Sequence, residues 1–271
     1  MLNAMLGECL HDSFVEWDPA HYLADYYACV EEDEQYTLQF LLREFKKLKN
    51  RPVALEFGIG PTVHHILPLS PYVSEIHVAD YLPANLAEVR KWQTGQADAH
   101  NWQAFTEYIL AHSGTSTPRQ PDIANREALT RSRITRYLIG DASHDQPLGR
   151  DSRRRYECLL SCYCADSATS DKTIWYQYMA NILGLLKPGG FFVTAALRNC
   201  QWYRVGQNYF PSADVDEHDF ERLFASHPFD MDSVTIQVER VPSHAAFGYE
   251  SIVLASGFLA DLSLTTQPEV S

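Results

Sequence analysis

The sequence is short of basic residues. It has 22 lysines and arginines against 35 aspartates and glutamates, which gives a formal net charge of −13 over 271 residues. A surface with this excess of negative charge repels phosphate backbones and anionic lipid headgroups. The composition therefore argues against a nucleic-acid substrate and against docking on an anionic membrane.

Long apolar runs are also missing. No stretch approaches the ~18 consecutive apolar residues that a membrane-spanning helix needs. Acidic side chains such as Glu8 and Asp12 stand early in the chain, where a secretory signal peptide would carry basic ones. We therefore expect no membrane partner, a cytoplasmic location and a monomer.

Cysteines and metal-ligand patterns are sparse. Six cysteines in a chain of this length do not make a disulfide framework. Three of them, Cys158, Cys162 and Cys164, lie in or just after an apolar strand, where buried reduced thiols are expected. Neither a second cysteine pair nor a histidine pair stands at zinc-binding spacing. The sequence predicts no metal site.

The most informative segment that is present covers residues 53–61, Val-Ala-Leu-Glu-Phe-Gly-Ile-Gly-Pro. It predicts a buried strand that ends at two glycines, where the backbone can approach a ligand because no Cβ fills the space. Twenty residues after Gly60, a second apolar segment ends in Asp80, where nucleotide-binding α/β sheets place a carboxylate against ribose hydroxyls. Together these features predict a nucleoside site.

The same segment argues against a dinucleotide. Val63 occupies the position of the third glycine in the dinucleotide pattern, and Pro61 follows Gly60 directly. The next helix is therefore poorly suited to hold a pyrophosphate at its N-terminus. An adenosine without phosphates fits better, which indicates S-adenosylmethionine. A nicotinamide-dinucleotide oxidoreductase and a non-catalytic adenosine-binding domain are the alternatives.

Apolar periodicity predicts an α/β protein with a seven-stranded, mostly parallel sheet. The expected strands are 52–57, 76–80, 137–139, 156–161, 191–196, 234–241 and 250–258, and the last two form an antiparallel pair. Helices are expected before residue 51, from about 63, at 82–92 and at 171–186. We expect one domain over 1–261, with a helical cap at 1–50, a polar insertion at 94–134 holding one short helix (102–110), and a flexible tail at 262–271.

These residues resemble the class I S-adenosylmethionine-dependent methyltransferases, and more narrowly the nicotinamide, phenylethanolamine and indolethylamine N-methyltransferases. The resemblance rests on the segments 18–27, 56–62, 80–86, 185–190 and 202–206. It implies a Rossmann-like fold with an N-terminal helical cap. It also implies methyl transfer from S-adenosylmethionine, with S-adenosylhomocysteine as the product, to a small-molecule acceptor, foremost an amine nitrogen.

The resemblance also implies roles for individual residues. The cofactor would contact Tyr22, Tyr27, Gly58, Gly60, Thr62, Asp80, Tyr81, Asn85, Asp141, Ala142 and Cys162. The acceptor would contact Tyr22, Tyr163, Ala196, Tyr203 and Ser212. Tyr22 would lie over the reacting centre and is the candidate catalytic residue.

Two positions depart from the family pattern. Ala196 stands where the nicotinamide-methylating relative has an acidic residue, so the group expected to hold a carboxamide or an ammonium is absent there. Nicotinamide is therefore not the expected acceptor. His64 stands where the family often has a tyrosine near the cofactor carboxylate, and the alternative is an exposed histidine in the first turn of a helix.

Overall fold

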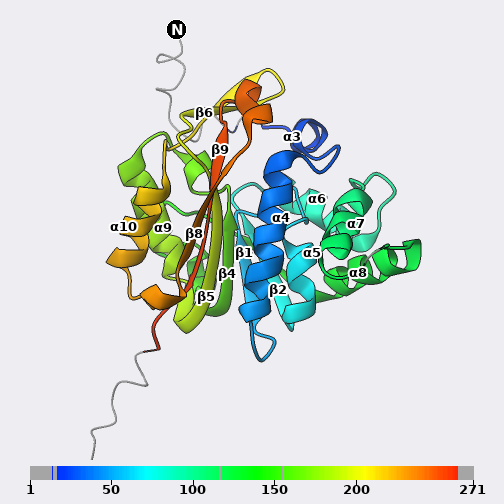
Figure 1. The fold of residues 1–271 in the computed structure, drawn as a ribbon, viewed down its shortest axis with the longest axis horizontal. Coiled ribbons are helices and arrows are strands. Elements are labelled where there is room, and N and C mark those ends of the chain that lie inside the picture. The colour runs from blue at the N-terminus through cyan, green and yellow to red at the C-terminus, as the bar shows by residue number, and fades with distance from the viewer. Residues whose placement is uncertain (1–13, 15–16, 116, 154, 262–271) are drawn as a thin grey trace, which may run out of the picture.

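One mixed sheet with helices on both faces forms the centre of the protein (Figure 1). The computed structural model describes residues 14, 17–115, 117–153 and 155–261, so the tail expected at 262–271 lies outside the described residues. The strands of the sheet are β1 (Val53–Phe57), β2 (Glu75–Asp80), β3 (Ile134–Ile139), β4 (Tyr156–Cys162), β5 (Leu186–Leu197), β8 (Thr235–Arg240) and β9 (Ser251–Phe258).

The sheet has the order β3-β2-β1-β4-β5-β9-β8. The first five of these strands pair in parallel, and β9 runs antiparallel to both β5 and β8. This confirms the predicted seven-stranded, mostly parallel sheet with an antiparallel last pair. The strand order reverses between β1 and β4, and open α/β sheets bind their ligands beyond the carboxyl ends of the strands at such a point.

Two hydrophobic cores lie on opposite faces of the sheet. One core contains side chains of α4 (Glu32–Glu44), α5 (Ile66–Leu69), α6 (Pro83–Thr94) and α7 (Gln103–His112). The other contains side chains of α9 (Lys172–Leu183) and α10 (Glu217–Ser226). Figure 1 shows these two groups on either side of the strands. No helix in the described part of the chain is long and apolar enough to cross a membrane.

The segment expected as a polar insertion is more helical than predicted. It forms α7 and also α8 (Gln120–Arg133), which was not predicted. Helix α8 is hard to recognise from sequence because Ile123 is its one buried apolar side chain. In contrast, Phe105 and Ile109 of α7 are fully buried in the core, so α7 is an integral layer of the fold.

Three other elements differ from the predictions. The helix expected from about residue 63 is only the single turn α5, because Pro68 and Pro71 prevent a longer helix. Helix α10 was missed, although Asp216 and Asp219 form a capping box at its start. The hairpin of β6 (Trp202–Val205) and β7 (Asn208–Pro211) was also missed.

This hairpin and the first described helix cover the carboxyl ends of the strands. Helix α3 (Pro19–Tyr26) begins at the N-cap Asp18, whose side chain accepts a hydrogen bond from the backbone of Ala20. The Tyr26 hydroxyl donates to the carbonyl oxygen of Arg204 on β6 over 2.7 Å. In addition, the Asp25 carboxylate accepts from the Gly206 amide in the hairpin turn. The cover is therefore held together by hydrogen bonds between segments far apart in sequence.

Candidate active site

A cavity lies at the carboxyl ends of the five parallel strands. Each strand contributes a residue at its end or just beyond it: Gly58 after β1, Asp80 on β2, Asp141 after β3, Tyr163 after β4 and Leu197 on β5. Aromatic side chains from α3 and from the β6–β7 hairpin also line it. The cavity stands where the strand order reverses, as expected for a ligand site in this type of sheet.

The two glycines after β1 serve different needs. Gly58 has a φ of 76° and Gly60 a φ of 63°, both in the left-handed region. A Cβ on Gly58 would lie 2.1 Å from Cys164 Sγ, so the fold itself requires glycine there. A Cβ on Gly60 would have no atom of the described residues within 4 Å, and Gly60 lines the cavity. Gly60 therefore keeps space free for a ligand.

Asp80 connects this turn to the second strand. Its Oδ2 accepts a hydrogen bond from the Gly60 amide at 2.7 Å, and its Oδ1 accepts from the Leu82 amide and from Asn85 Nδ2, each at 2.9 Å. Asn85 Oδ1 in turn accepts from Trp17 Nε1 at 2.8 Å. Burial raises the pKa of Asp80, and the hydrogen bonds offset only part of that rise. The carboxylate is thus fixed in one orientation at the cavity wall.

Tyrosines form a second part of the cavity wall, called here the tyrosine wall: Tyr22, Tyr26, Tyr27 and Tyr203. The Tyr22 ring lies 4.8 Å from the Trp17 ring and 5.2 Å from the Tyr26 ring, centroid to centroid. Its hydroxyl lies 3.1 Å from the Tyr27 hydroxyl. Burial raises the pKa values of Tyr22, Tyr27 and Tyr203 well above the ordinary value for tyrosine. These side chains are neutral at physiological pH and offer aromatic faces and hydroxyl groups.

Tyr163 has an unusual backbone conformation. Its φ is 51°, in the left-handed region that residues other than glycine rarely adopt. Its amide donates to the Ala195 carbonyl at 2.7 Å, and its hydroxyl lies 2.6 Å from Thr37 Oγ1 on α4. Such strain persists only where the surrounding structure holds it, and it concentrates at ligand sites.

Acidic side chains outnumber basic ones in the lining of the cavity, where His65 is the one basic side chain among the described residues. The described residues that line it include Asp33, Glu34, Asp80 and Asp141 but no lysine or arginine. A pyrophosphate would find no lysine or arginine to bind it here, whereas a cation would be attracted by the carboxylates. The acidic side chains of the cavity therefore favour a ligand with a sulfonium or an ammonium over a dinucleotide.

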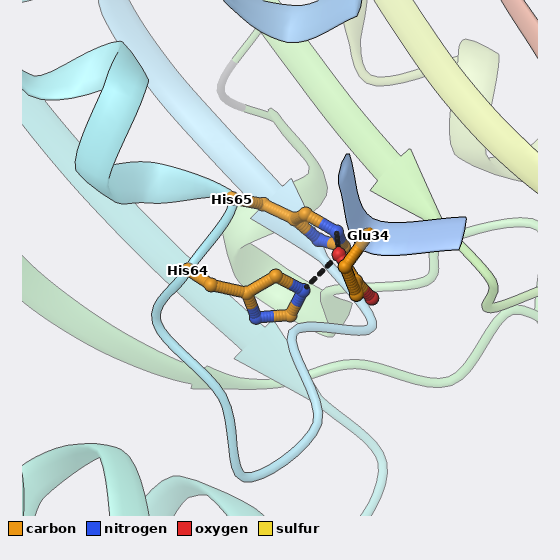
Figure 2. Close-up of side chains that lie close together, drawn as sticks. All are labelled: Glu34, His64 and His65. Carbon is orange, nitrogen blue, oxygen red and sulfur yellow. Dashed lines mark ion pairs between the residues drawn. The ribbon is translucent and has the colours of Figure 1, made fainter. Parts of the chain in front are cut away.

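The acidic residues of α4 were not predicted as site residues. Asp33 Oδ2 accepts a hydrogen bond from the Tyr249 hydroxyl at 2.7 Å, and Asp33 Oδ1 lies 3.2 Å from His244 Nε2. Glu34 Oε2 lies 3.0 Å from His64 Nε2 (Figure 2). Because α4 carries four acidic residues at its start, the sequence suggests a solvated helix end. The sequence feature that indicates burial is the position of Glu34, which continues the apolar face of α4 at helical spacing.

The comparisons with known proteins agree with this geometry. Residues 9–251 match the family described as the NNMT/PNMT/TEMT family. The chain belongs to this family. It is 29% identical to the indolethylamine N-methyltransferase of Mus musculus over 214 residues, which cover 76% of this chain and 80% of that protein. It is also 29% identical to the nicotinamide N-methyltransferase of Homo sapiens over 203 residues, which cover 72% and 75%.

Solved structures show the same fold. A complex titled DhpI-SAH has a TM-score of 0.56 at 10% identity and covers 95% of this chain and 98% of its own. The 1,6-didemethyltoxoflavin-N1-methyltransferase of Burkholderia thailandensis has a TM-score of 0.50 at 15% identity, with 93% and 88% covered. They confirm the predicted Rossmann-like fold. The family match confirms the methyltransferase activity and S-adenosylmethionine as the cofactor.

The structure brings most of the predicted site residues of this family member together. The following line the cavity: Tyr22, Tyr27, Gly58, Gly60, Thr62, Asp80, Tyr81, Asn85, Asp141, Ala142, Cys162, Tyr163 and Tyr203. Ala196 and Ser212 do not line it. Ala196 is buried in the core beside α9 and α10, and the next residue, Leu197, faces the cavity instead. Ser212 is buried beyond the hairpin, where its amide donates to the Gln201 carbonyl.

His64 corrects one expectation. The alternative of an exposed histidine in the first turn of a helix is wrong, because His64 is 0% exposed. It precedes α5, and its ring stacks on Trp102 with centroids 5.4 Å apart and planes 9° from parallel. Burial lowers the pKa of His64 to about 4, so its imidazole is neutral at physiological pH.

Asp166, next to the cavity, predicts a dependence of stability on pH. Its Oδ2 accepts from the Leu197 amide at 2.9 Å, and burial raises its pKa to about 7. The unfolded chain releases this proton near pH 4, so the folded state binds it more tightly. This contribution is complete below about pH 4 and is lost as the pH rises through 7. Between pH 5 and pH 8, the free energy of unfolding of the unmodified chain should therefore fall more than that of Asp166→Asn, by on the order of 2 kcal/mol.

Chemical denaturation across this pH range measures the difference. Asp230→Asn is the matched control, because Asp230 is exposed and distant in sequence. Its pH dependence should follow that of the unmodified chain. Parallel curves for the unmodified chain and Asp166→Asn would contradict the assignment of this proton to Asp166.

Proposed function

We propose that this enzyme transfers the methyl group of S-adenosylmethionine to the nitrogen of a small-molecule amine. The observation that supports this most is the Asp80 carboxylate, fixed by three donors beside the glycine turn in a cavity that no lysine or arginine of the described residues lines. When bound, the cofactor supplies an electrophilic methyl group on a sulfonium. The residues of the chain orient the two reactants and exclude water.

The cofactor roles follow from the positions of the lining residues. Asp80 would accept hydrogen bonds from the ribose hydroxyls, with Asn85 holding the carboxylate in place. Gly58, Gly60 and Thr62 would border the methionine portion, and Asp141 with Ala142 the adenine. In this arrangement the methyl group would point toward the tyrosine wall, where Tyr22 and Tyr203 leave room for an acceptor.

The chemistry at this wall is displacement at carbon. Positive charge moves from sulfur to nitrogen during the reaction, and the faces of Tyr22 and Tyr27 are suited to stabilise it by cation–π attraction. The acceptor nitrogen must be unprotonated when it attacks. The raised pKa values of the tyrosines exclude them as bases at neutral pH, so the proton leaves to water or to a carboxylate of the acidic wall.

Two variants of Tyr22 separate its ring from its hydroxyl. Tyr22→Leu removes the ring and should lower kcat about 3- to 30-fold, the range expected for about 0.5–2 kcal/mol of cation–π stabilisation. Tyr22→Phe keeps the ring and loses only the contact with the Tyr27 hydroxyl, so its kcat should change less than about threefold. Equal losses in the two variants would contradict a role for the aromatic face.

The acceptor atom is tested directly by product analysis. The purified chain would be incubated with methyl-labelled S-adenosylmethionine and a panel of small amines, phenols and thiols, and products would be identified by mass spectrometry. Label on at least one amine nitrogen is the expected result. Label on oxygen or sulfur alone would overturn N-methylation, and cofactor binding without any product would favour the non-catalytic adenosine-binding alternative. A monomeric state and a cytoplasmic location remain predictions.

A further inference from the structure

A cluster of one carboxylate and two histidines lies at the wall of the cavity, which Glu34 and His65 line. Glu34 comes from α4, and His64 and His65 precede α5. Figure 2 shows both imidazole rings directed at the Glu34 carboxylate. Glu34 Oε2 lies 3.0 Å from His64 Nε2 and 3.7 Å from His65 Nε2, and the three side chains are at least 95% buried.

The converging atoms lack hydrogen-bond partners. Glu34 Oε2, His64 Nε2 and His65 Nε2 are each buried and unpaired by hydrogen-bond geometry, despite their short separations. Buried polar atoms in native proteins are almost always satisfied, and an unpaired group calls for an ion or a water. Three such atoms that point at one place indicate a shared ligand.

Their spacing fits a metal ion. Histidine nitrogens and carboxylate oxygens bind zinc at about 2.0–2.2 Å, so tetrahedral ligands lie about 3.3–3.6 Å apart. The separations of 3.0 Å and 3.7 Å bracket this range, and the three ligand atoms all lie within 4.8 Å of one another.

The surroundings have the features of a metal site. His65 Nδ1 lies 3.2 Å from Glu56 Oε1 on β1, which is the carboxylate–histidine pairing that orients a metal-binding imidazole. With Glu34 and Glu56 both ionised, the cluster would carry two negative charges, because a histidine that binds metal is neutral. One divalent cation therefore balances the charge of the cluster, in which two carboxylates are otherwise almost completely buried.

We propose that Glu34, His64 and His65 bind one divalent transition-metal ion of the zinc class. Glu34 and His65 also line the cavity, so the ion can enter from there. The sequence predicted no metal site because the two histidines are adjacent and their carboxylate partner lies thirty residues earlier. This site does not depend on the proposed methylation of an amine.

Metal titration of the whole chain tests the proposal. The chain would be stripped with a chelator, freed of it, and titrated with ZnCl₂ by calorimetry in a non-coordinating buffer. We expect one ion per chain with a micromolar or tighter Kd and a higher melting temperature in its presence. Titration with Co²⁺ should give the visible absorption of four-coordinate cobalt. Failure to bind Zn²⁺ at stoichiometric concentration would overturn the proposal.

Variants locate the ion. Glu34→Gln, which keeps the shape of the side chain, and His64→Ala should each abolish stoichiometric zinc binding and the cobalt absorption. Glu56→Gln, which disturbs only the partner of His65, should weaken the affinity about 10- to 100-fold. His100→Ala is the matched control, because His100 also contacts Trp102 but donates to the Tyr27 carbonyl outside the cluster. Unchanged binding in Glu34→Gln would place the ion elsewhere and contradict the proposal.

Discussion

Replacing Asp80 with alanine is expected to weaken the binding of S-adenosylmethionine by about 100- to 10,000-fold. A hydrogen bond to a charged group contributes about 1.5–3 kcal/mol, and the carboxylate would accept two from the ribose. The substitution also frees the Gly60 amide, which donates to Asp80 Oδ2, so the glycine turn would lose one of its supports. Isothermal titration calorimetry with S-adenosylmethionine and S-adenosylhomocysteine measures the loss.

A matched variant separates binding from folding. Asp216 also accepts hydrogen bonds from backbone amides, those of His218 and Asp219 at the start of α10, but it does not line the cavity. Asp216→Ala should lower the free energy of unfolding by about 1 kcal/mol, the usual effect of losing an N-cap, and leave cofactor affinity unchanged. If Asp80→Ala binds the cofactor as well as Asp216→Ala does, the assignment of Asp80 to the ribose is wrong.

Gly58→Ala is expected to destabilise the fold by about 2–5 kcal/mol. About 1–2 kcal/mol arises from placing an alanine in the left-handed region. A further 1–3 kcal/mol, roughly, arises from the collision of the new methyl group with Cys164. The methyl carbon would lie 2.1 Å from Cys164 Sγ and 2.5 Å from Cys164 Cβ. Urea denaturation followed by circular dichroism gives the free energy of unfolding.

Gly60→Ala provides the comparison for Gly58→Ala. It has the same backbone strain but no collision with the described residues, so its destabilisation should stay at about 1–2 kcal/mol. Its methyl group would enter the cavity and should weaken cofactor binding. Adding Cys164→Gly to Gly58→Ala removes the colliding atoms and should recover part of the stability. Equal destabilisation by the two glycine substitutions would contradict this reading of the turn.

The central strands of the sheet could be predicted from sequence because their apolar pattern is typical of buried parallel strands. Parallel strands are buried on both faces, so β1, β2 and β4 are near-continuous apolar runs that end at the glycine turn, at Asp80 and at Tyr163. The peripheral helices were harder to predict. Helix α8 has few buried apolar side chains, and α10 is recognisable chiefly from its capping box.

The residues of the candidate site likewise include some that could be predicted from sequence and some that could not. Residues at strand ends, such as Gly60, Asp80 and Asp141, could be predicted because parallel strands bring their carboxyl ends to one edge of the sheet. Glu34 could not, because its place depends on how α4 packs across the sheet. Residues 34, 38, 41 and 45 form one buried stripe of that helix, and this register was the available signal.

Sequence alone also did not show which of two adjacent strand residues faces the cavity. Ala196 and Leu197 follow each other on β5, yet only Leu197 reaches the cavity, since successive strand residues point to opposite faces. A shift of one residue in the register therefore exchanges a core position for a cavity position. The acceptor-contacting roles inferred from the resemblance for Ala196 and Ser212 stay predictions, and neither residue lines the cavity.

A crystal structure of the chain with S-adenosylhomocysteine tests the central claim most directly. We predict that the ribose hydroxyls lie within hydrogen-bond distance of the Asp80 carboxylate, and that the homocysteine portion passes over Gly60 toward the tyrosine wall. A ribose bound away from Asp80, or the product bound outside this cavity, would contradict the account.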